Sequence, residues 1–214
     1  AAAMTLAFSA HAATGPNSSK APYVLPTAAG VTLTSILTVG DTADNGYKMV
    51  GLPDGLGAFD NGDGTITVTM NHELGNTVGA VRAHGSIGAF VSKWVVRKSD
   101  LKVLSGMDLV QSPTDMYTWS TVTNGWVAGT TAIGRTCSAD LAEPSAYYNP
   151  VTKKGVKGVR IHMNGEESGA EGRAFAWVVG DGATSSTAWE LPALGRFSWE
   201  NAVASRVKQD KTIV

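Results

Sequence analysis

The chain has 214 residues, of which 43% are hydrophobic and 16% charged, and its 17 basic and 18 acidic residues give a formal net charge of -1. This length is sufficient for one hydrophobic core, and the balanced charge gives no electrostatic reason to expect a nucleic-acid or membrane-surface partner. Glycine supplies 25 residues, well above its usual share of about 7%, and charged residues fall below their usual share of about 25%. This composition favours a turn-rich extracellular β protein.

The N-terminal residues resemble the end of a secretory signal. A short apolar run precedes an Ala-x-Ala pattern at Ala10 and Ala12, although the basic segment that opens such signals is missing, and a chance alanine-rich tail is the other interpretation. We expect a signal remnant at 1–13, a linker at 14–26 and a single β domain at 27–214. No apolar run reaches the ~18 residues of a membrane-spanning helix, so a secreted, periplasmic or extracellular protein is predicted.

Alternating and β-rich runs predict short strands and almost no helix. The clearest run places Ile66, Val68 and Met70 on one face. The Asn-Gly and Asp-Gly turn chemistry at 60–64 predicts a hairpin that joins this run to 57–59. The predicted strands cover residues 31–37, 65–70, 89–97, 126–128, 156–163 and 174–179.

These strands and glycine-rich turns indicate an all-β fold of the sandwich, barrel or propeller type. No internal repeat at the length of a propeller blade is present. Residues 211–214 have the composition of a strand interior, so we expect the chain to be the N-terminal portion of a larger protein. Its open edge strands would then favour self-association.

Glutamates follow three of the predicted strands or turns. Glu73 follows the strand ending at Met70, Glu166 and Glu167 follow the strand ending at Met163, and Glu200 follows a Gly-Arg-Phe turn. If these ends meet at one edge, the carboxylates need a cation or a proton to offset their repulsion. Oxygen ligands suit Ca²⁺, and a thiolate admits a transition metal such as iron.

Cys137 is the single cysteine, so the chain has no internal disulfide. The neighbouring Arg135 is expected to lower the pKa of the thiol toward that of a ligand thiolate. Each residue also has a structural interpretation. A lone cysteine is more often a small buried hydrophobe, His72 is more often a hydrogen-bonded residue at a strand end, and glutamate clusters are often solvated. The tryptophans are expected in the core, with Trp119 and Trp126 as candidates to line a pocket.

Four short segments follow one another along the chain: 69–73 (TMNHE), 135–138 (RTCS), 163–167 (MNGEE) and 194–202 (LGRFSWENA). In this order they resemble the PhoX-type alkaline phosphatases and their secreted relatives. The resemblance covers roughly residues 50–214, and its most specific elements are Asn-His-Glu and Gly-Arg-Phe-x-x-Glu. Two features depart from the family pattern: Trp199 stands where a histidine is common, and the stretch from Cys137 to the pair Glu166 and Glu167 is longer.

The resemblance implies a secreted β-propeller phosphomonoesterase with a cysteine-bridged Fe(III) pair and Ca²⁺ at its phosphate site. By that resemblance Cys137 is the bridging thiolate, Glu167 and Glu200 are iron or calcium ligands, and Glu73 and Glu166 are further carboxylate ligands. The expected partners are small phosphate esters. Phosphate contacts are expected from Arg135, Arg173 and Arg196, because one guanidinium group can donate two parallel hydrogen bonds to phosphate oxygens.

Two other hypotheses remain open from the sequence. The chain is either a non-catalytic calcium-binding surface or filament protein that assembles through its edge strands, or a hydrolase that uses calcium alone. Glu171 lies outside the matched segments and precedes Gly172 and Arg173, where a surface ion pair is a sufficient explanation.

Overall fold

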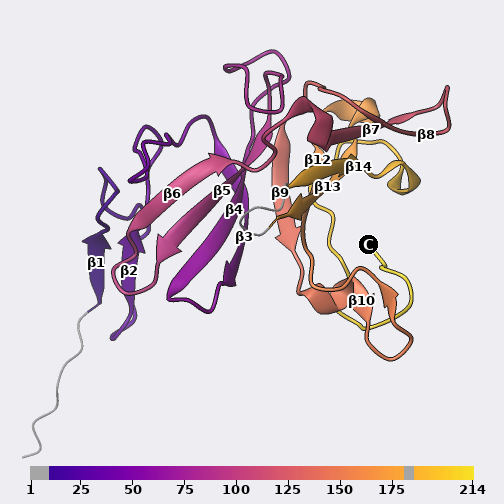
Figure 1. Cartoon of the computed structure of the whole chain (residues 1–214). Helices are drawn as coiled ribbons and strands as arrows, with labels where there is room; N and C mark the ends of the chain where they lie inside the picture. Colours follow the sequence, from indigo (N-terminus) through magenta and orange to yellow (C-terminus); the bar gives the residue numbers. More distant parts are fainter. Residues whose placement is uncertain (1–9, 181–185) are drawn as a thin grey trace, which may run out of the picture. The chain divides into compact units, whose positions relative to one another are not determined.

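The computed structural model of the chain, described over residues 10–180 and 186–214, confirms the all-β class (Figure 1). Within these residues the helical elements are single 3-10 turns at Pro113–Asp115, Pro144–Ala146, Gly169–Glu171 and Pro192–Leu194. None of the described helices is long and apolar enough to cross a membrane. The strands are β1 (His11–Thr14), β2 (Thr32–Ser35), β3 (Pro53–Asp60), β4 (Thr65–His72), β5 (Phe90–Arg97), β6 (Val103–Asp108), β7 (Met116–Ser120), β8 (Gly125–Ala128), β9 (Thr136–Leu141), β10 (Tyr148–Asn149), β11 (Lys154–Gly155), β12 (Arg160–Glu166), β13 (Ala174–Val179) and β14 (Thr187–Glu190).

The chain divides into two compact units. The first contains residues 10–49, 60–66 and 94–106, and the second contains the described residues of 50–59, 67–93 and 107–214. In the first unit, β1 pairs in parallel with β2, from His11 beside Thr32 to Thr14 beside Ser35. Most of the predicted signal remnant, residues 1–9, lies outside the described residues, whereas its last residues belong to β1.

The second unit is built on a six-stranded sheet with the order β8-β7-β14-β13-β12-β9. Its neighbours are antiparallel except for β14 and β7, which pair in parallel. Alternation along β12 and β13 gives the sheet two buried faces, because successive side chains point to opposite sides. One face packs Phe175 and Trp177 into the main apolar cluster, and the other packs Met163 with Trp199.

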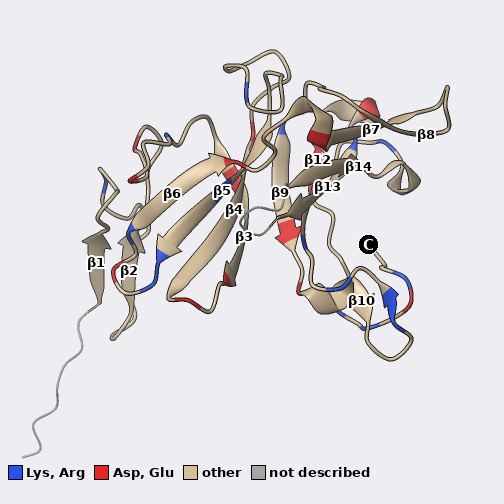
Figure 2. Ribbon diagram, in the orientation of Figure 1, with Lys and Arg blue, Asp and Glu red and all other residues tan. Residues whose placement is uncertain are grey.

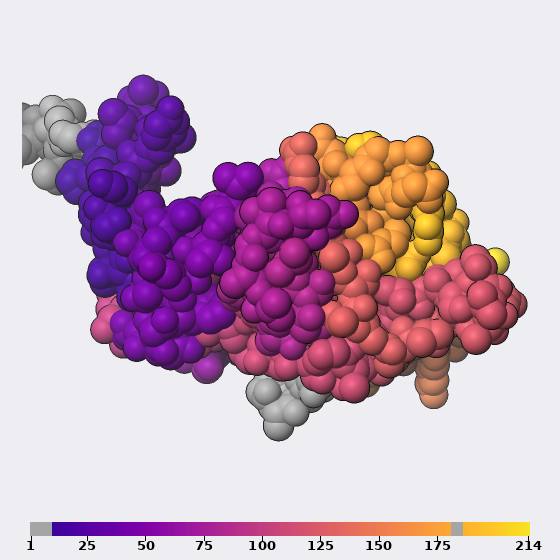
Figure 3. All heavy atoms as spheres, turned by 90° about the horizontal axis from the view of Figure 1, so that it is seen from above, coloured from indigo at the N-terminus to yellow at the C-terminus, as the bar shows by residue number. Residues whose placement is uncertain are grey.

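Residues near the C-terminus cover part of this second face. Figure 3 shows the yellow C-terminal residues beside the orange segment that contains β12 and β13. Trp199 lies against β12 because Gly165 has no side chain: a Cβ there would lie 2.4 Å from the Trp199 Cβ. Gly165 therefore permits the close approach that fixes the backbone just before Glu200.

Strands β3, β4, β5 and β6 form a four-stranded sheet in that order. The predicted hairpin at 60–64 is confirmed, since β3 ends at Asp60 and β4 begins at Thr65. Gly62 and Gly64 take positive φ angles of 78° and 89°, which glycine adopts without steric cost. Figure 2 shows that charged residues lie mainly at strand ends and in loops, while the strands themselves are largely tan.

Two predicted strand assignments need correction. Residues 156–159 are an exposed or half-buried turn, and β12 begins only at Arg160. Residues 211–214 form no strand, although the Ile213 carbonyl accepts a hydrogen bond from the Ser205 amide. A β-branched composition alone does not produce a strand where no neighbouring strand offers a ladder of partners. The propeller arrangement stays a prediction.

Candidate metal centre

The structure brings one thiol and four carboxylates together in the second unit. Two groups of three have candidate ligand atoms within 4.8 Å of one another: Asp54, Glu73 and Cys137 form one, and Cys137, Glu167 and Glu200 form the other. Cys137 belongs to both groups. Four of the five residues, all but Asp54, are ones for which the sequence predicted a metal ligand.

Antiparallel pairing brings two pairs of these residues together. The first residue of β9, Thr136, pairs with the last residue of β12, Glu166. In the hairpin of β3 and β4, the start of β3 likewise lies at the same edge as the end of β4. In antiparallel neighbours the beginning of one strand meets the end of the next, so Asp54 and Glu73 are held at one edge, and Cys137 and Glu167 at another.

Main-chain hydrogen bonds connect the segments that carry these side chains. Their N···O distances run from 2.8 to 3.1 Å, within the normal range for backbone hydrogen bonds. These bonds hold the backbone at or beside Glu73, Cys137, Glu167 and Glu200 against another segment. The bonds run from the Glu73 amide to Leu52 O, from Arg135 to Leu74 O, from Glu167 to Arg135 O and from Ser138 to Glu200 O.

Asp54 is the member of the centre that sequence reasoning missed. It precedes Gly55, which lies so close to β9 that a Cβ there would be 2.3 Å from the Ala139 amide nitrogen. This close crossing brings Asp54 within 3.5 Å of the Cys137 thiol. Its signal in the sequence is an acidic residue at the start of a hairpin strand, whereas the predicted ligands follow strands or turns.

Adding a methyl group at this crossing tests the geometry. Gly55→Ala is expected to push β3 from β9 and to destabilise the fold by about 1–3 kcal/mol, the usual cost of overpacking. Gly125→Ala in β8 is the matched control, since the nearest atom to its Cβ would lie 3.9 Å away. Urea unfolding followed by circular dichroism measures both. Equal midpoints for the two variants would contradict the close crossing.

Cys137 is surrounded by negative charge. Its Sγ lies 3.3 Å from a Glu200 carboxylate oxygen and 3.5 Å from one of Asp54. Burial, followed by the hydrogen bonds and charges of these two carboxylates, raises the pKa of the thiol from 9.0 to about 12. The expectation that Arg135 lowers this pKa is therefore wrong, because the Arg135 guanidinium pairs instead with Glu73 at 2.5 Å and Glu167 at 3.1 Å.

Without a cation, Cys137 is therefore expected to be a poor nucleophile. In chelator-treated protein its alkylation rate should keep rising with pH above 9, since the thiolate forms only toward pH 12. Glu200→Gln should accelerate alkylation at pH 8 by removing one of the two nearby negative charges. The rate is measured by quenching the alkylation reaction at intervals and determining the modified fraction by mass spectrometry. Glu171→Gln is the control, because it removes the same charge outside the centre. A rate that levels off near pH 9 would refute the raised pKa.

The donor set fits cation binding. Four carboxylates and a thiol face a single guanidinium, so the centre carries uncompensated negative charge unless protons or cations are bound. Carboxylate oxygens suit Ca²⁺, and a thiolate shared by two carboxylate pairs suits a transition metal. A bound cation would also reverse the effect of the carboxylates on the thiol, because it deprotonates a coordinating cysteine.

The structure does not bring Glu166 into this centre, although the sequence placed it there with Glu167. Glu166 is buried, and its carboxylate accepts hydrogen bonds from Arg173 Nε at 2.7 Å and from the Gly134 amide at 2.8 Å. The Arg173 guanidinium also donates to the other Glu166 oxygen, to Thr131 Oγ1 and to Ala132 O. Both predicted roles, ligand for Glu166 and phosphate contact for Arg173, are at odds with this closed ion pair.

Arg196 also forms its ion pairs with residues that are not among the five ligand candidates. It pairs with Glu190 at 3.2 Å and with the exposed Glu171 at 3.3 Å. The surface ion pair expected at Glu171 is thus present, with Arg196 as its partner. Of the three arginines expected to contact phosphate, Arg135 alone has ion pairs to members of the centre.

His72 has the structural role that the sequence favoured. It is fully buried, its two ring nitrogens lie 2.6 Å from Val50 O and 2.8 Å from Ser92 Oγ, and its ring stacks on Phe90. Burial lowers the pKa of His72 to about 4. The imidazole is therefore neutral and fully hydrogen-bonded near neutral pH.

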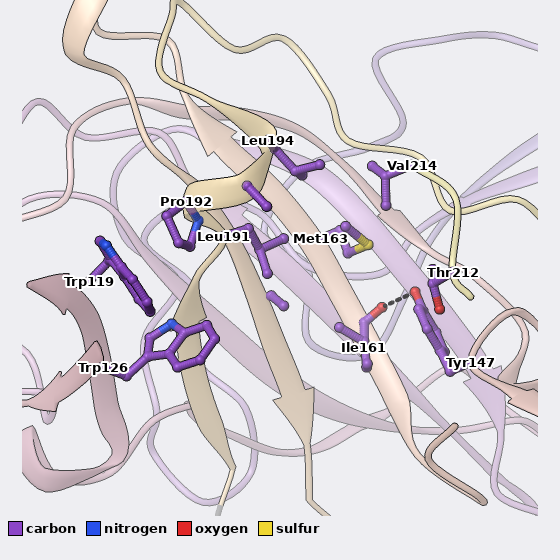
Figure 4. A pocket seen from close by; sticks show the side chains of 12 residues that line it. Trp119, Trp126, Tyr147, Ile161, Met163, Leu191, Pro192, Leu194, Thr212 and Val214 are labelled. Atoms are coloured by element: carbon purple, nitrogen blue, oxygen red, sulfur yellow. Dashed lines mark hydrogen bonds between the residues drawn. The ribbon is translucent and has the colours of Figure 1, made fainter. Parts of the chain in front are cut away.

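A separate apolar pocket lies on the six-stranded sheet. Its volume is about 650 Å³, and its lining confirms the pocket expected at Trp119 and Trp126. Figure 4 shows these two indoles on one side of the pocket and Tyr147 on the other, with Ile161 between them. The lining is almost entirely apolar and contains none of the five ligand candidates. Comparison of the chain with protein-family models, curated proteins and solved structures found no match.

Proposed function

We propose that this chain carries the metal centre of a secreted, PhoX-like phosphomonoesterase, which releases phosphate from small organic phosphate esters. The observation that supports the proposal most is the position of Cys137 in both groups of ligand candidates. A thiolate shared by two carboxylate pairs is the arrangement that the family resemblance implies for a cysteine-bridged Fe(III) pair with Ca²⁺ nearby. The propeller architecture and the secreted location belong to the same proposal.

The residues divide into distinct tasks under this proposal. Asp54 and Glu73 would hold one cation with Cys137, and Glu167 and Glu200 would hold a second with the same thiolate. When bound, such cations neutralise phosphoryl oxygens and activate an oxygen nucleophile. Arg135 is the arginine placed to bind a phosphate oxygen, because its half-exposed guanidinium reaches both cation groups.

The test combines metal analysis with turnover. Purified protein supplied with Fe(III) and Ca²⁺ is expected to retain both ions and to hydrolyse a chromogenic phosphate monoester. Arg135→Lys should weaken substrate binding, because lysine cannot form the paired contact, and the exposed Arg206→Lys is the control. A protein that binds neither ion and shows no turnover when both ions are supplied at stoichiometric concentration would refute the proposal.

A non-catalytic calcium-binding assembly protein is the second candidate. The observation that favours it is edge strand β8, at one end of the six-stranded sheet, whose Trp126 and Val127 are about half exposed. Exposed apolar edges pair readily with other chains. This candidate predicts calcium-dependent assembly, seen by light scattering, without hydrolysis. A monomer that is indifferent to chelators would exclude it.

A further inference from the structure

A continuous polar network lies buried behind the metal centre. Its members come from β4, β12 and β13, and all of them are almost completely inaccessible to solvent. Buried polar side chains are costly unless every donor and acceptor is matched, and a fully matched set rigidifies the core. The members of the network are Thr69, Asn71, His162, Asn164 and Trp177.

The hydrogen bonds of this network run in one direction. The Trp177 indole N–H donates to Asn164 Oδ1 at 2.8 Å, and the Asn164 amide donates to Asn71 Oδ1 at 2.8 Å. The Asn71 amide then donates to the Cys137 carbonyl at 2.6 Å and to that of Ser138 at 3.3 Å. This series of hydrogen bonds starts at an indole N–H, which can only donate, and ends at carbonyls, which can only accept. Both amide orientations are therefore fixed.

His162 is a second hydrogen-bond partner of the Asn71 side-chain oxygen. Its Nε2 lies 2.8 Å from Asn71 Oδ1, and its Nδ1 lies 2.9 Å from Thr69 Oγ1. Because Asn71 Oδ1 can only accept, His162 carries its proton on Nε2 and accepts the Thr69 hydroxyl proton at Nδ1. The Asn71 oxygen thus receives two donors, which leaves its NH₂ group directed at β9.

The network ends at the backbone of the one residue that both ligand groups share. Asn71 also lies two residues before Glu73 on the same chain segment. The residue therefore links the end of β4, which carries Glu73, to the start of β9, which carries Cys137. Ser138, held by the same amide, donates its own N–H to Glu200 O, so the link extends to the second ligand group.

We propose that Asn71 is a positioning residue that holds the start of β9 so that the Cys137 thiol stays between the two carboxylate pairs. This inference rests on the proposed function where it assigns Cys137 to a metal, but the positioning itself is a property of the metal-free protein. Outer partners that orient metal ligands typically contribute about 10- to 100-fold to metal affinity. The same range is expected for Asn71.

The test uses two variants. In Asn71→Ser the side chain is too short for its hydroxyl to reach β9, and Trp177→Phe removes the indole N–H that is the first donor of the hydrogen-bond series. Val91→Ala, a core truncation outside the network, controls for general destabilisation. The first readout is the alkylation rate of Cys137 in chelator-treated protein at one pH. We expect both network variants to react several-fold faster than wild type, because a loosened β9 start exposes the thiol, while the control is unchanged at equal folded fraction.

The second readout is the sulfur-to-metal charge-transfer absorption of the Co²⁺-loaded protein. Asn71→Ser is expected to bind Co²⁺ about 10- to 100-fold more weakly and with a weakened band, and Trp177→Phe with a smaller loss. No band in wild type would overturn the proposed metal site but leave the alkylation rates to decide on positioning. If Asn71→Ser does not fold, Trp177→Phe decides: rates and band equal to those of the control overturn the proposal.

Discussion

Under the proposed function, replacing Cys137 with serine is expected to abolish iron binding and to leave calcium binding intact. Cys137 is the only cysteine in the sequence and the only residue shared by both ligand groups. A serine hydroxyl cannot supply the soft thiolate that favours a transition metal, whereas the four carboxylates still offer oxygen ligands to Ca²⁺. Iron content should fall from stoichiometric to background.

Metal analysis after dialysis against both ions measures this outcome, and circular dichroism verifies that the variant is folded. Ser99→Ala, at an exposed residue outside both ligand groups, is the control. Iron retained in Cys137→Ser would refute the bridging role. Calcium and turnover without iron in the wild type would instead support the hydrolase that uses calcium alone.

Replacing Glu166 with glutamine is expected to destabilise the fold by about 3–5 kcal/mol, the usual cost of breaking a buried ion pair. The Glu166 carboxylate accepts hydrogen bonds from the Arg173 guanidinium, the Arg173 amide and the Gly134 amide. Glutamine would turn one acceptor into a donor that faces these donors. It would also leave the charge of Arg173, whose side chain is only 16% exposed, without its partner.

Glu171→Gln provides the control for this prediction, because it changes the same residue type five positions away. Glu171 is 83% exposed in its ion pair with Arg196, and such pairs contribute about 0–1 kcal/mol. Urea midpoints give both values. Combining Glu166→Gln with Arg173→Met should recover part of the loss, since no buried charge is then unpaired. Similarly small decreases in unfolding free energy for Glu166→Gln and Glu171→Gln would show that the buried ion pair does not stabilise the fold.

The sequence predicted the strands whose apolar residues alternate or gather. The runs at 65–70, 89–97 and 174–179 correspond closely to β4, β5 and β13. Strand β9, with the sequence TCSADL, was missed because it contains few of the β-branched and aromatic residues that mark a strand. Its apolar face carries only Cys137, Ala139 and Leu141. The parallel pairing of β14 with β7 could not be predicted from local sequence patterns either, since it joins segments about 70 residues apart.

The candidate site was predicted in part because strand ends concentrate functional side chains. Placing Glu166 and Glu167 in the same site was the avoidable error. Consecutive residues of an extended segment point to opposite sides, so one of the two had to face away from the centre. The structure shows that Glu166 turns to Arg173. Asp54 could not be found by the same rule, because its place depends on the close crossing at Gly55.

The backbone hydrogen bonds between the ligand-bearing segments separate the framework of the site from its chemistry. Positions 73, 167 and 200 are held through main-chain atoms, so their side chains can change without redirecting the chain. Histidine at two of these positions would convert an oxygen-rich donor set into one suited to zinc or copper. The scaffold is therefore a starting point for redesigning metal preference by side-chain replacement alone.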